Sequence, residues 1–318
     1  MTLDLGKLDK QHQVLFAVPL EPVQGRRFQP TGFPDLGAAT YKTPGGLGLL
    51  VESAQSMANR FEAACWDDAS QDLPPDLKGL SYVRVDDQQG KFLTSSVLEA
   101  HRLNSVYIEK ANDGKFHKEL ETAIDVSDKR PLDRKKLVDA VFKYDAGSLV
   151  HGFFLESIDG RLRVARALTA FIEADDVAVA ASGGVKNDRV KPGKSEGQGA
   201  AEGFGNVPFH RDEYIASGIT LFVNLDLAQL RGYGLPSSAE RLLVLLSLYK
   251  VRALLDRKLR LRTACDLKVV QPRITSTNID GFELPDSSSL KAALRAAIGE
   301  CKEIFGGENG VTKVTYKA

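Results

Sequence analysis

Polar side chains suited to nucleic-acid binding gather in residues 205–211, of sequence GNVPFHR. This segment places the Asn206 amide, the His210 imidazole and the Arg211 guanidinium close together along the chain. Such groups stack on unpaired bases or hydrogen-bond to their edges. A few residues earlier, the segment SGGVK offers successive backbone N–H groups followed by an ammonium, a combination that can hold a phosphate. Its members are Ser182, Gly183, Gly184 and Lys186, around Val185.

Two further segments repeat these residue types. Gln229, Arg231 and Tyr233 follow one another where a predicted strand ends. Arg161 and Arg163 alternate with apolar residues, so we expect both guanidiniums on one face of a strand that follows an Asp-Gly turn. Each segment alone is also compatible with an ordinary turn or a charged surface. Their concentration in one half of the chain favours nucleic-acid binding.

Signatures of catalysis are weak by comparison. The glycines at 197, 199 and 203 are spaced one residue too widely for a dinucleotide fingerprint, and no Walker phosphate loop or G-x-S-x-G elbow occurs. The five histidines have no metal-ligand spacing, and the acidic pairs at 67–68 and 175–176 are typical of solvated turns. We therefore expect no catalytic residue, no bound metal and no cofactor.

The composition is that of a globular chain in a reducing compartment. The 318 residues are 43% hydrophobic and 26% charged, with 42 basic and 42 acidic side chains, so no global field attracts nucleic acid. The three cysteines are far apart and predict no disulfide framework. Because no apolar run has membrane length and the first residues carry charges of both signs, we expect a cytoplasmic protein without a signal peptide.

Hydrophobic periodicity predicts a sheet with helices on one face. Strands are expected at 14–20, 82–85, in the 148–182 stretch, at 214–227 and at 264–270. Helices are expected at 49–66, 132–144, 238–261 and 287–305, followed by a frayed tail. The 238–261 helix begins almost wholly apolar and should be deeply buried. Without insertions the order is close to βαββαβ, so we predict an α+β fold with an antiparallel, RNA-recognition-like sheet.

This order divides the chain into six segments. Residues 1–92 are the first part of the sheet domain, or palm, and 93–145 are a charged insertion. Residues 146–181 supply palm strands, and 182–209, with seven glycines, form a long loop or hairpin. Residues 210–273 complete the palm with a strand, a helix and a strand, and 274–318 form a C-terminal helix and tail.

Several short segments of the sequence resemble those of one known family. QPTGFPDLG, VESAQSMANRFE, SLVHGFF, RALTAFIEA, SGGVK, GFGNVPFHR and NLDLAQLRGYGL occur in this order from about residue 27 to about residue 270. Together they are similar to the backbone subunit of type I-U (also called I-G) CRISPR effector complexes, a member of the repeat-associated (RAMP) superfamily.

The resemblance implies a modified RNA-recognition fold that binds guide RNA and has no active site. Copies of the subunit would polymerise along the guide spacer and present it for pairing with target DNA. Its partners would be other subunits of the complex and a separate helicase-nuclease. The protein would not bind a membrane. The glycine-rich 182–209 segment is the candidate for the thumb that kinks the RNA, with part of 93–145 as the alternative. Guide-binding residues expected here are Arg26, Arg27, Gln55, Asn59, Arg60, His151, Arg161, Arg163, Arg166, Ser182, Gly183, Gly184, Lys186, Asn206, His210, Arg211, Gln229, Arg231 and Tyr233.

Two other functions remain open from the sequence. One is a metal-dependent endoribonuclease on the same fold, using Asp188 or His210. The other is an assembly protein that contacts no RNA. On the 49–66 helix, Asn59 and Arg60 are expected to reach the guide or a neighbouring copy.

Overall fold

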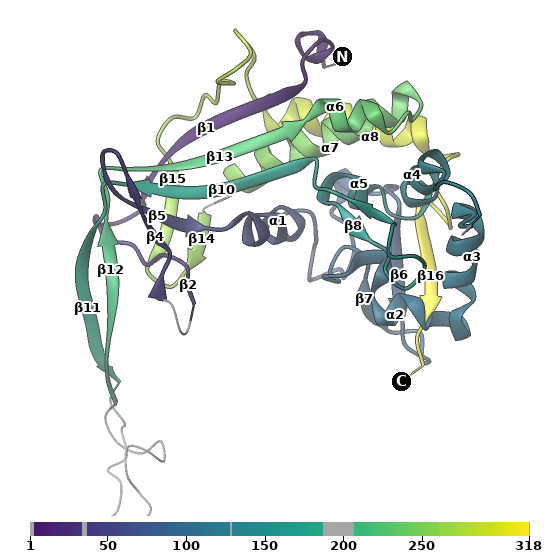
Figure 1. Cartoon of the computed structure of the whole chain (residues 1–318), viewed down its shortest axis with the longest axis horizontal. Helices are drawn as coiled ribbons and strands as arrows, with labels where there is room; N and C mark the ends of the chain where they lie inside the picture. Colours follow the sequence, from purple (N-terminus) through teal and green to yellow (C-terminus); the bar gives the residue numbers. More distant parts are fainter. Residues whose placement is uncertain (1–2, 34–36, 128, 187–206, 258, 318) are drawn as a thin grey trace, which may run out of the picture.

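The computed structural model describes residues 3–317, apart from 34–36, 128, 187–206 and 258. Figure 1 shows three parts: a central sheet backed by helices, a two-stranded hairpin at one end, and a second module at the other. The hairpin and the second module extend from the same side of the sheet, so the molecule has the shape of an arch.

The central sheet has seven strands in the order β14-β15-β1-β13-β10-β5-β4. Its middle is a βαββαβ unit made of β1 (Gln13–Pro22), α1 (Ala54–Ala63), β10 (Leu168–Asp175), β13 (Gly218–Asp226), α7 (Ser237–Leu255) and β15 (Cys265–Val269). The four strands of this unit lie side by side in the order β15, β1, β13, β10, which is fourth, first, third and second along the chain. Each is antiparallel to its neighbour. The predicted α+β fold with an RNA-recognition-like antiparallel sheet is confirmed.

Short strands widen this sheet at both edges. On one side lies β14 (Leu259–Arg262); on the other lie β5 (Gly46–Glu52) and β4 (Thr40–Thr43). A separate two-stranded ladder joins β2 (Gly32–Phe33) to β3 (Gly37–Ala38). The predicted 49–66 helix is wrong at its start, because its first residues pair as β5 with β4 and β10, and Ser53 then caps α1 by accepting from Ser56 N.

Burial alternates along the strands and fixes which face carries the helices. In β13, Ile219, Leu221, Val223 and Leu225 are buried, and the residues between them are partly exposed. Helix α7 is buried almost all round, as predicted, since α8 (Ser287–Cys301) packs against it. It ends at Leu255 and not at Leu261, because the chain turns there into β14.

The second module is inserted between α1 and β10. It contains β6 (Tyr82–Asp86), β7 (Phe92–Ser95), α2 (Val106–Glu109), α3 (Lys115–Ile124), α4 (Arg134–Tyr144), α5 (Ala146–His151), β8 (Phe153–Phe154) and β9 (Arg163–Val164). Three 3₁₀ helices described for this module are η2 (Pro75–Leu77), η3 (Arg102–Asn104) and η4 (Ala111–Gly114); a fourth, η1 (Gly6–Leu8), precedes β1. The predicted frayed tail is wrong: β16 (Val311–Thr315) returns to pair in parallel with β6, and Val314 is buried there.

The hairpin is inserted between β10 and β13. Its strands, β11 (Ala178–Lys186) and β12 (Val207–Ile215), pair antiparallel along their whole described length. The two ends of the glycine-rich segment therefore belong to paired strands, which cover residues 178–186 and 207–215. Figure 1 shows the hairpin directed away from the body. Its exposed apolar side chains are Val179, Val185, Phe209 and Ile215.

Candidate nucleic-acid interface

Two hollows lie near the junction of the second module with the central sheet, and together we call them the groove. The outer hollow, of about 570 Å³, lies between α4, β9 and α6 (Leu227–Gly232). The inner hollow, of about 340 Å³, lies between α1, the 97–102 segment and the end of α5. The segment 163–166 contributes to both hollows, since Arg163–Ala165 line the outer one and Arg166 lines the inner one.

The rim of the outer hollow is cationic. Helix α4 begins at Arg134 because the Asp133 carboxylate accepts from the Lys135 and Lys136 N–H groups at 3.0 and 3.1 Å. This start places the exposed side chains of Arg134 and Lys135 at the hollow, where Lys135 also pairs with Asp139. Across the hollow, the Arg163 guanidinium lies 4.7 Å from the centroid of the Phe154 ring.

Hydrogen bonds between uncharged groups hold the floor of the outer hollow in place. The Tyr233 hydroxyl donates to Leu149 O at 2.8 Å and accepts from Gln229 Nε2 at 2.8 Å. Gln229 Nε2 also donates to Ala165 O at 2.7 Å. Burial raises the pKa of Tyr233 to about 12, so the hydroxyl stays neutral at pH 7. The hollow thus has a neutral, hydrogen-bonded floor below exposed cations, which suits a strand of phosphates and sugars.

The inner hollow is lined by amides and carboxylates. Helix α1 presents Gln55 and Asn59, with Gln55 Nε2 donating to Asn59 Oδ1 at 3.3 Å and Gln55 Oε1 accepting from Arg166. Deeper in the hollow, Glu62 pairs with Arg102. Burial raises the pKa of the Glu62 carboxyl, and the neighbouring Arg102 opposes this rise.

A buried histidine forms part of the inner wall. His151 is the last residue of α5 and is 4% exposed, and neither of its ring nitrogens has a hydrogen-bond partner. Burial lowers the pKa of His151 well below 6.5, as do nearby Lys250, Arg102 and Arg166, so the ring is neutral at pH 7. Only glycine fits the next position: Gly152 has φ +76, and a Cβ there would lie 2.8 Å from Val164 O.

The groove unites seven of the residues that the sequence proposed for binding. They are Gln55, Asn59, His151, Arg163, Arg166, Gln229 and Tyr233. Gln229 and Tyr233 are contributed by α6 and the residue after it rather than by a strand end. Sequence reasoning did not propose Arg134 or Lys135 for binding. The available signal was a run of cations at a predicted helix start, where the helix dipole disfavours them.

Three proposed arginines hold the protein together instead. Arg60 pairs with the buried Glu52 and donates to Leu261 O at 2.6 Å, so the expectation that it reaches the guide is not supported by its position. Arg231 donates to Gln11 O. Arg161 pairs with Asp159 in a turn, and only Arg163 is in a strand; the prediction of two guanidiniums on one strand face is therefore wrong.

The remaining proposed residues lie on or beside the hairpin, at the other end of the molecule (Figure 1). Ser182 pairs with Arg211 and Gly183 with His210. Arg211 and Arg27 both contact the buried Glu213 carboxylate, at 2.7 and 3.7 Å, and Arg26 is exposed nearby in sequence. The predicted phosphate cradle is wrong, because Ser182 to Lys186 are extended and successive N–H groups point to opposite sides. Asn206 and Asp188 lie outside the described residues, as does the Lys186 side chain.

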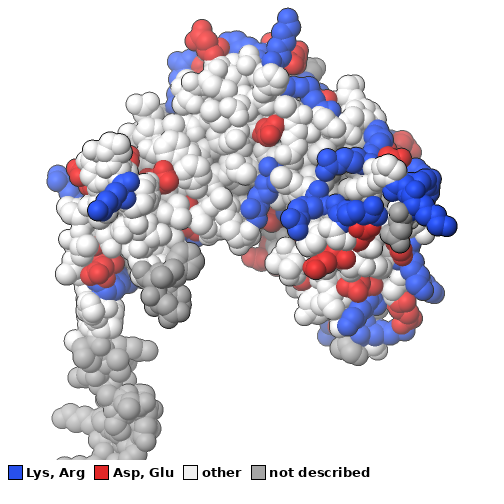
Figure 2. All heavy atoms as spheres, viewed as in Figure 1, with Lys and Arg blue, Asp and Glu red and all other residues white. Residues whose placement is uncertain are grey.

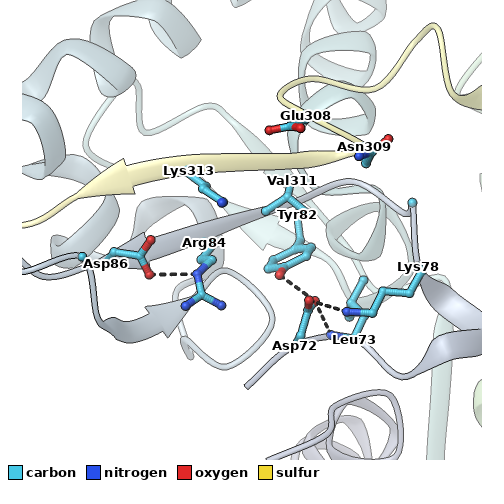
Figure 3. Close-up of a pocket in the computed structure, with 12 residues that line it drawn as sticks. Asp72, Leu73, Lys78, Tyr82, Arg84, Asp86, Glu308, Asn309, Val311 and Lys313 are labelled. Carbon is cyan, nitrogen blue, oxygen red and sulfur yellow. Dashed lines mark hydrogen bonds and ion pairs between the residues drawn. The ribbon is translucent and has the colours of Figure 1, made fainter. Parts of the chain in front are cut away.

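Another hollow, of about 690 Å³, lies elsewhere on the second module and is lined by charged groups of both signs (Figure 3). Its Asp72 carboxylate accepts from the Tyr82 hydroxyl at 2.8 Å and pairs with Lys78. Arg84 pairs with Asp86 at 2.8 Å. These matched pairs stabilise the module, and we assign no ligand to them.

The described part of the chain has neither a metal-ligand cluster nor a membrane-length helix. No group of three or more His, Cys, Asp or Glu side chains in it is arranged to hold a metal ion. None of its helices combines the length and the apolar character needed to cross a membrane.

Figure 2 shows where charge gathers on one face of the arch: Lys and Arg side chains are concentrated over the second module, and the underside between the module and the hairpin is hollowed.

Comparison with known proteins gives a family and distantly similar solved structures. Residues 14–179 match the family described as CRISPR-associated protein GSU0053. No curated protein matches the chain. A chain of the solved structure "CRISPR RNA-guided surveillance complex, pre-nicking" is similar at 12% identity and a TM-score of 0.38, over 80% of this chain and 75% of that one.

Proposed function

Because the chain belongs to the CRISPR-associated GSU0053 family, as its sequence words indicated, we propose that it is a non-catalytic subunit that binds a CRISPR guide RNA along the groove. The observation that carries this proposal is that one segment, 163–166, contributes to two hollows. The outer one has Arg134, Lys135 and Arg163 at its rim, and the inner one is lined by amides together with carboxylates and arginines. Phosphates would lie at the cations, and bases would reach the amides.

The charge distribution supports this placement. The chain as a whole is neutral, so the phosphates of a guide must be neutralised locally. The exposed cations of the outer hollow are suited to this, because Arg134 and Arg163 are not in salt bridges with described carboxylates. By contrast, Arg211 and Arg27 at the hairpin already share Glu213.

The same proposal includes contact between copies of the chain along one guide. Val179, Val185, Phe209 and Ile215 are between 42% and 57% exposed on a hairpin that extends from the body. The strand register places Val179 and Val185 on one face of the hairpin and Phe209 and Ile215 on the other, so each face offers two exposed apolar side chains that another surface can cover. A second copy is the proposed cover, and head-to-tail contact of this kind forms an open filament that the guide length would end. Target DNA would then pair with the guide, and a separate helicase-nuclease would cleave it.

Salt dependence of RNA binding tests the groove. We expect the affinity for a fluorescent single-stranded RNA to fall steeply between about 50 and 200 mM salt, with about 0.7 in logarithmic slope for each phosphate contact. The double variant Arg134→Ala, Lys135→Ala should lower that slope by about 1.4. Lys268→Ala with Lys302→Ala is the matched control, since these exposed lysines line neither hollow. Equal slopes for both double variants would show that RNA does not use the groove.

Assembly and cleavage are tested with the same RNA. The mass of the complex should rise in steps as the RNA lengthens, and Phe209→Ser with Val185→Ser should restrict it to single copies. With Mg²⁺ added, the RNA should keep its length. Shortening that is lost in His210→Ala would instead establish the endoribonuclease alternative.

A further inference from the structure

The hydrogen bonds at the floor of the outer hollow fix the orientation of one side-chain amide, that of Gln229. Leu149 O is a carbonyl oxygen that can only accept, so the Tyr233 hydroxyl donates its single hydrogen to it at 2.8 Å. The Tyr233 oxygen must then accept, and the Gln229 atom that lies 2.8 Å from it must be the amide nitrogen, Nε2. Nε2 also donates at 2.7 Å to Ala165 O, which again can only accept. Both hydrogens of this nitrogen are therefore used within the protein.

The amide oxygen of Gln229, Oε1, is the atom of this side chain that is left for a ligand. Oε1 accepts from no group in the described part of the chain, yet it is not buried, and Gln229 lines the outer hollow. Because the nitrogen is held at two oxygens, the amide cannot turn round, and it offers the hollow only an acceptor. Gly232 lies three residues further along α6 and lines the same hollow, and a Cβ there would meet nothing within 4 Å. A ligand can therefore approach Oε1 closely.

A lone acceptor of fixed direction restricts which part of a nucleic acid can bind it. The phosphates that Arg134, Lys135 and Arg163 would hold are ionised and have no hydrogen to donate. The N–H groups of the bases differ from one base to the next, so an acceptor for them would favour some sequences over others. The ribose 2′-OH is a donor that every ribonucleotide carries beside its phosphate. It is therefore the donor that matches Oε1 for a strand of any sequence.

We propose that Gln229 is a specificity-determining residue that selects ribose over deoxyribose, with its Oε1 accepting from one 2′-OH of the strand in the outer hollow. This inference rests on the proposed function. The cations at the rim contribute affinity without this selection, because DNA has the same phosphates. Gln229 would thus lower the affinity for single-stranded DNA, which the rim alone would bind as well as RNA.

The test compares two single-stranded RNAs of equal sequence, one ordinary and one with fluorine in place of every 2′-OH. Fluorine preserves the sugar pucker of RNA and cannot donate a hydrogen bond. The wild-type protein should bind the fluorinated strand about fivefold more weakly for each copy bound, which is the effect of one net hydrogen bond. Gln229→Met keeps the length of the side chain and removes the acceptor, so it should bind both strands equally. Gln89→Met, at an exposed position that lines neither hollow, is the matched control and should keep the preference.

A second variant covers the case in which Gln229→Met loosens the floor of the hollow, which thermal unfolding by circular dichroism would show. The lysine of Gln229→Lys can still donate to Ala165 O and to the Tyr233 hydroxyl, but it has no acceptor. It should therefore also lose the preference for the ordinary strand, although its charge strengthens the binding of both strands.

The outcomes separate this inference from the proposed function. If the wild type binds both strands equally and with a steep salt dependence, RNA occupies the groove but the selection of ribose is refuted. If neither strand binds, the proposed function fails and this inference fails with it. A preference that survives in both Gln229 variants would show that another residue contacts the 2′-OH, and it would overturn the assignment to Gln229.

Discussion

Glu52 is the residue whose replacement should most clearly reveal what holds α1 against the sheet. Its side chain is 1% exposed at the end of β5. Oε1 accepts from Ser56 and from Arg60 Nε at 3.1 Å, and Arg262 is in ion-pair contact with Oε2 without hydrogen-bond geometry. One carboxylate thus joins β5, α1 and β14, and it neutralises two arginines whose pKa values are lowered by burial.

The change Glu52→Gln keeps the size of the side chain and removes its charge. Removing one partner of a buried ion pair costs about 3–5 kcal/mol, because the other charge stays desolvated. Arg60 and Arg262 are 26% and 22% exposed, and both also donate to backbone carbonyl groups. The lower end, about 3 kcal/mol, is therefore expected for the loss in unfolding free energy. Urea unfolding, followed by circular dichroism and by the fluorescence of the single tryptophan Trp66, measures it.

A surface pair provides the matched control for this measurement. Glu21 lies 3.1 Å from Lys268, and both side chains are about half exposed. Such pairs contribute about 0–1 kcal/mol, so Glu21→Gln should change stability little. A loss below about 1 kcal/mol in Glu52→Gln would contradict the reasoning, since it would mean that solvent already screens the site.

Three further predictions concern other contributions to stability. Gly310→Ala should be clearly more destabilising than Gly25→Ala. Both positions have positive φ, which costs about 1–2 kcal/mol for alanine, but a Cβ at Gly310 would lie 2.4 Å from Gly79 O, whereas one at Gly25 would meet nothing. Equal losses of unfolding free energy in urea would contradict the clash. The unfolding free energy should fall by up to about 1.4 kcal/mol per pH unit as the pH drops below 6.5. The reason is that His151 takes up a proton in the unfolded chain but not in the folded one, where its pKa is lowered. His151→Phe should flatten this decline, and an unchanged pH profile in the variant would refute the explanation. Leu246→Ala should cost about 3 kcal/mol, as expected for a leucine with no exposed surface in α7, and a loss under about 1 kcal/mol would show that the surrounding side chains collapse into the space.

The sequence predicted the sheet domain well where one face of each element is apolar. The alternation in β1 and the apolar helix α7 produce clear periodic signals, and both elements lie where they were expected. Prediction failed at element ends. Leu49 and Leu50 continue the spacing of α1, yet they pair as strand residues, and only the Ser53 cap marks the boundary. Strand β16 was missed because its partner, β6, is more than 200 residues away.

The groove was harder to predict because it depends on an inserted module. Gln55 and Arg163 are far apart in the sequence, and neither carries a signal for its partner. Arginines show this difficulty most clearly: Arg60, Arg161 and Arg231 match binding motifs by type, but each has an acceptor within the chain. Residue type shows that a cation is present, and only the fold shows whether a carboxylate or carbonyl already neutralises it.

Strand β10 connects the two parts of the molecule that the proposals assign to RNA and to a neighbouring copy. Its first residue, Leu168, follows the groove segment 163–166, and its last, Asp175, is followed within three residues by β11 of the hairpin. Eight residues of strand span about 26 Å. Because β10 is paired on both sides, with β13 and β5, this spacing cannot change without disrupting the sheet. The distance between groove and hairpin is therefore set by strand length, and a guide bound by successive copies would be held at a fixed repeat.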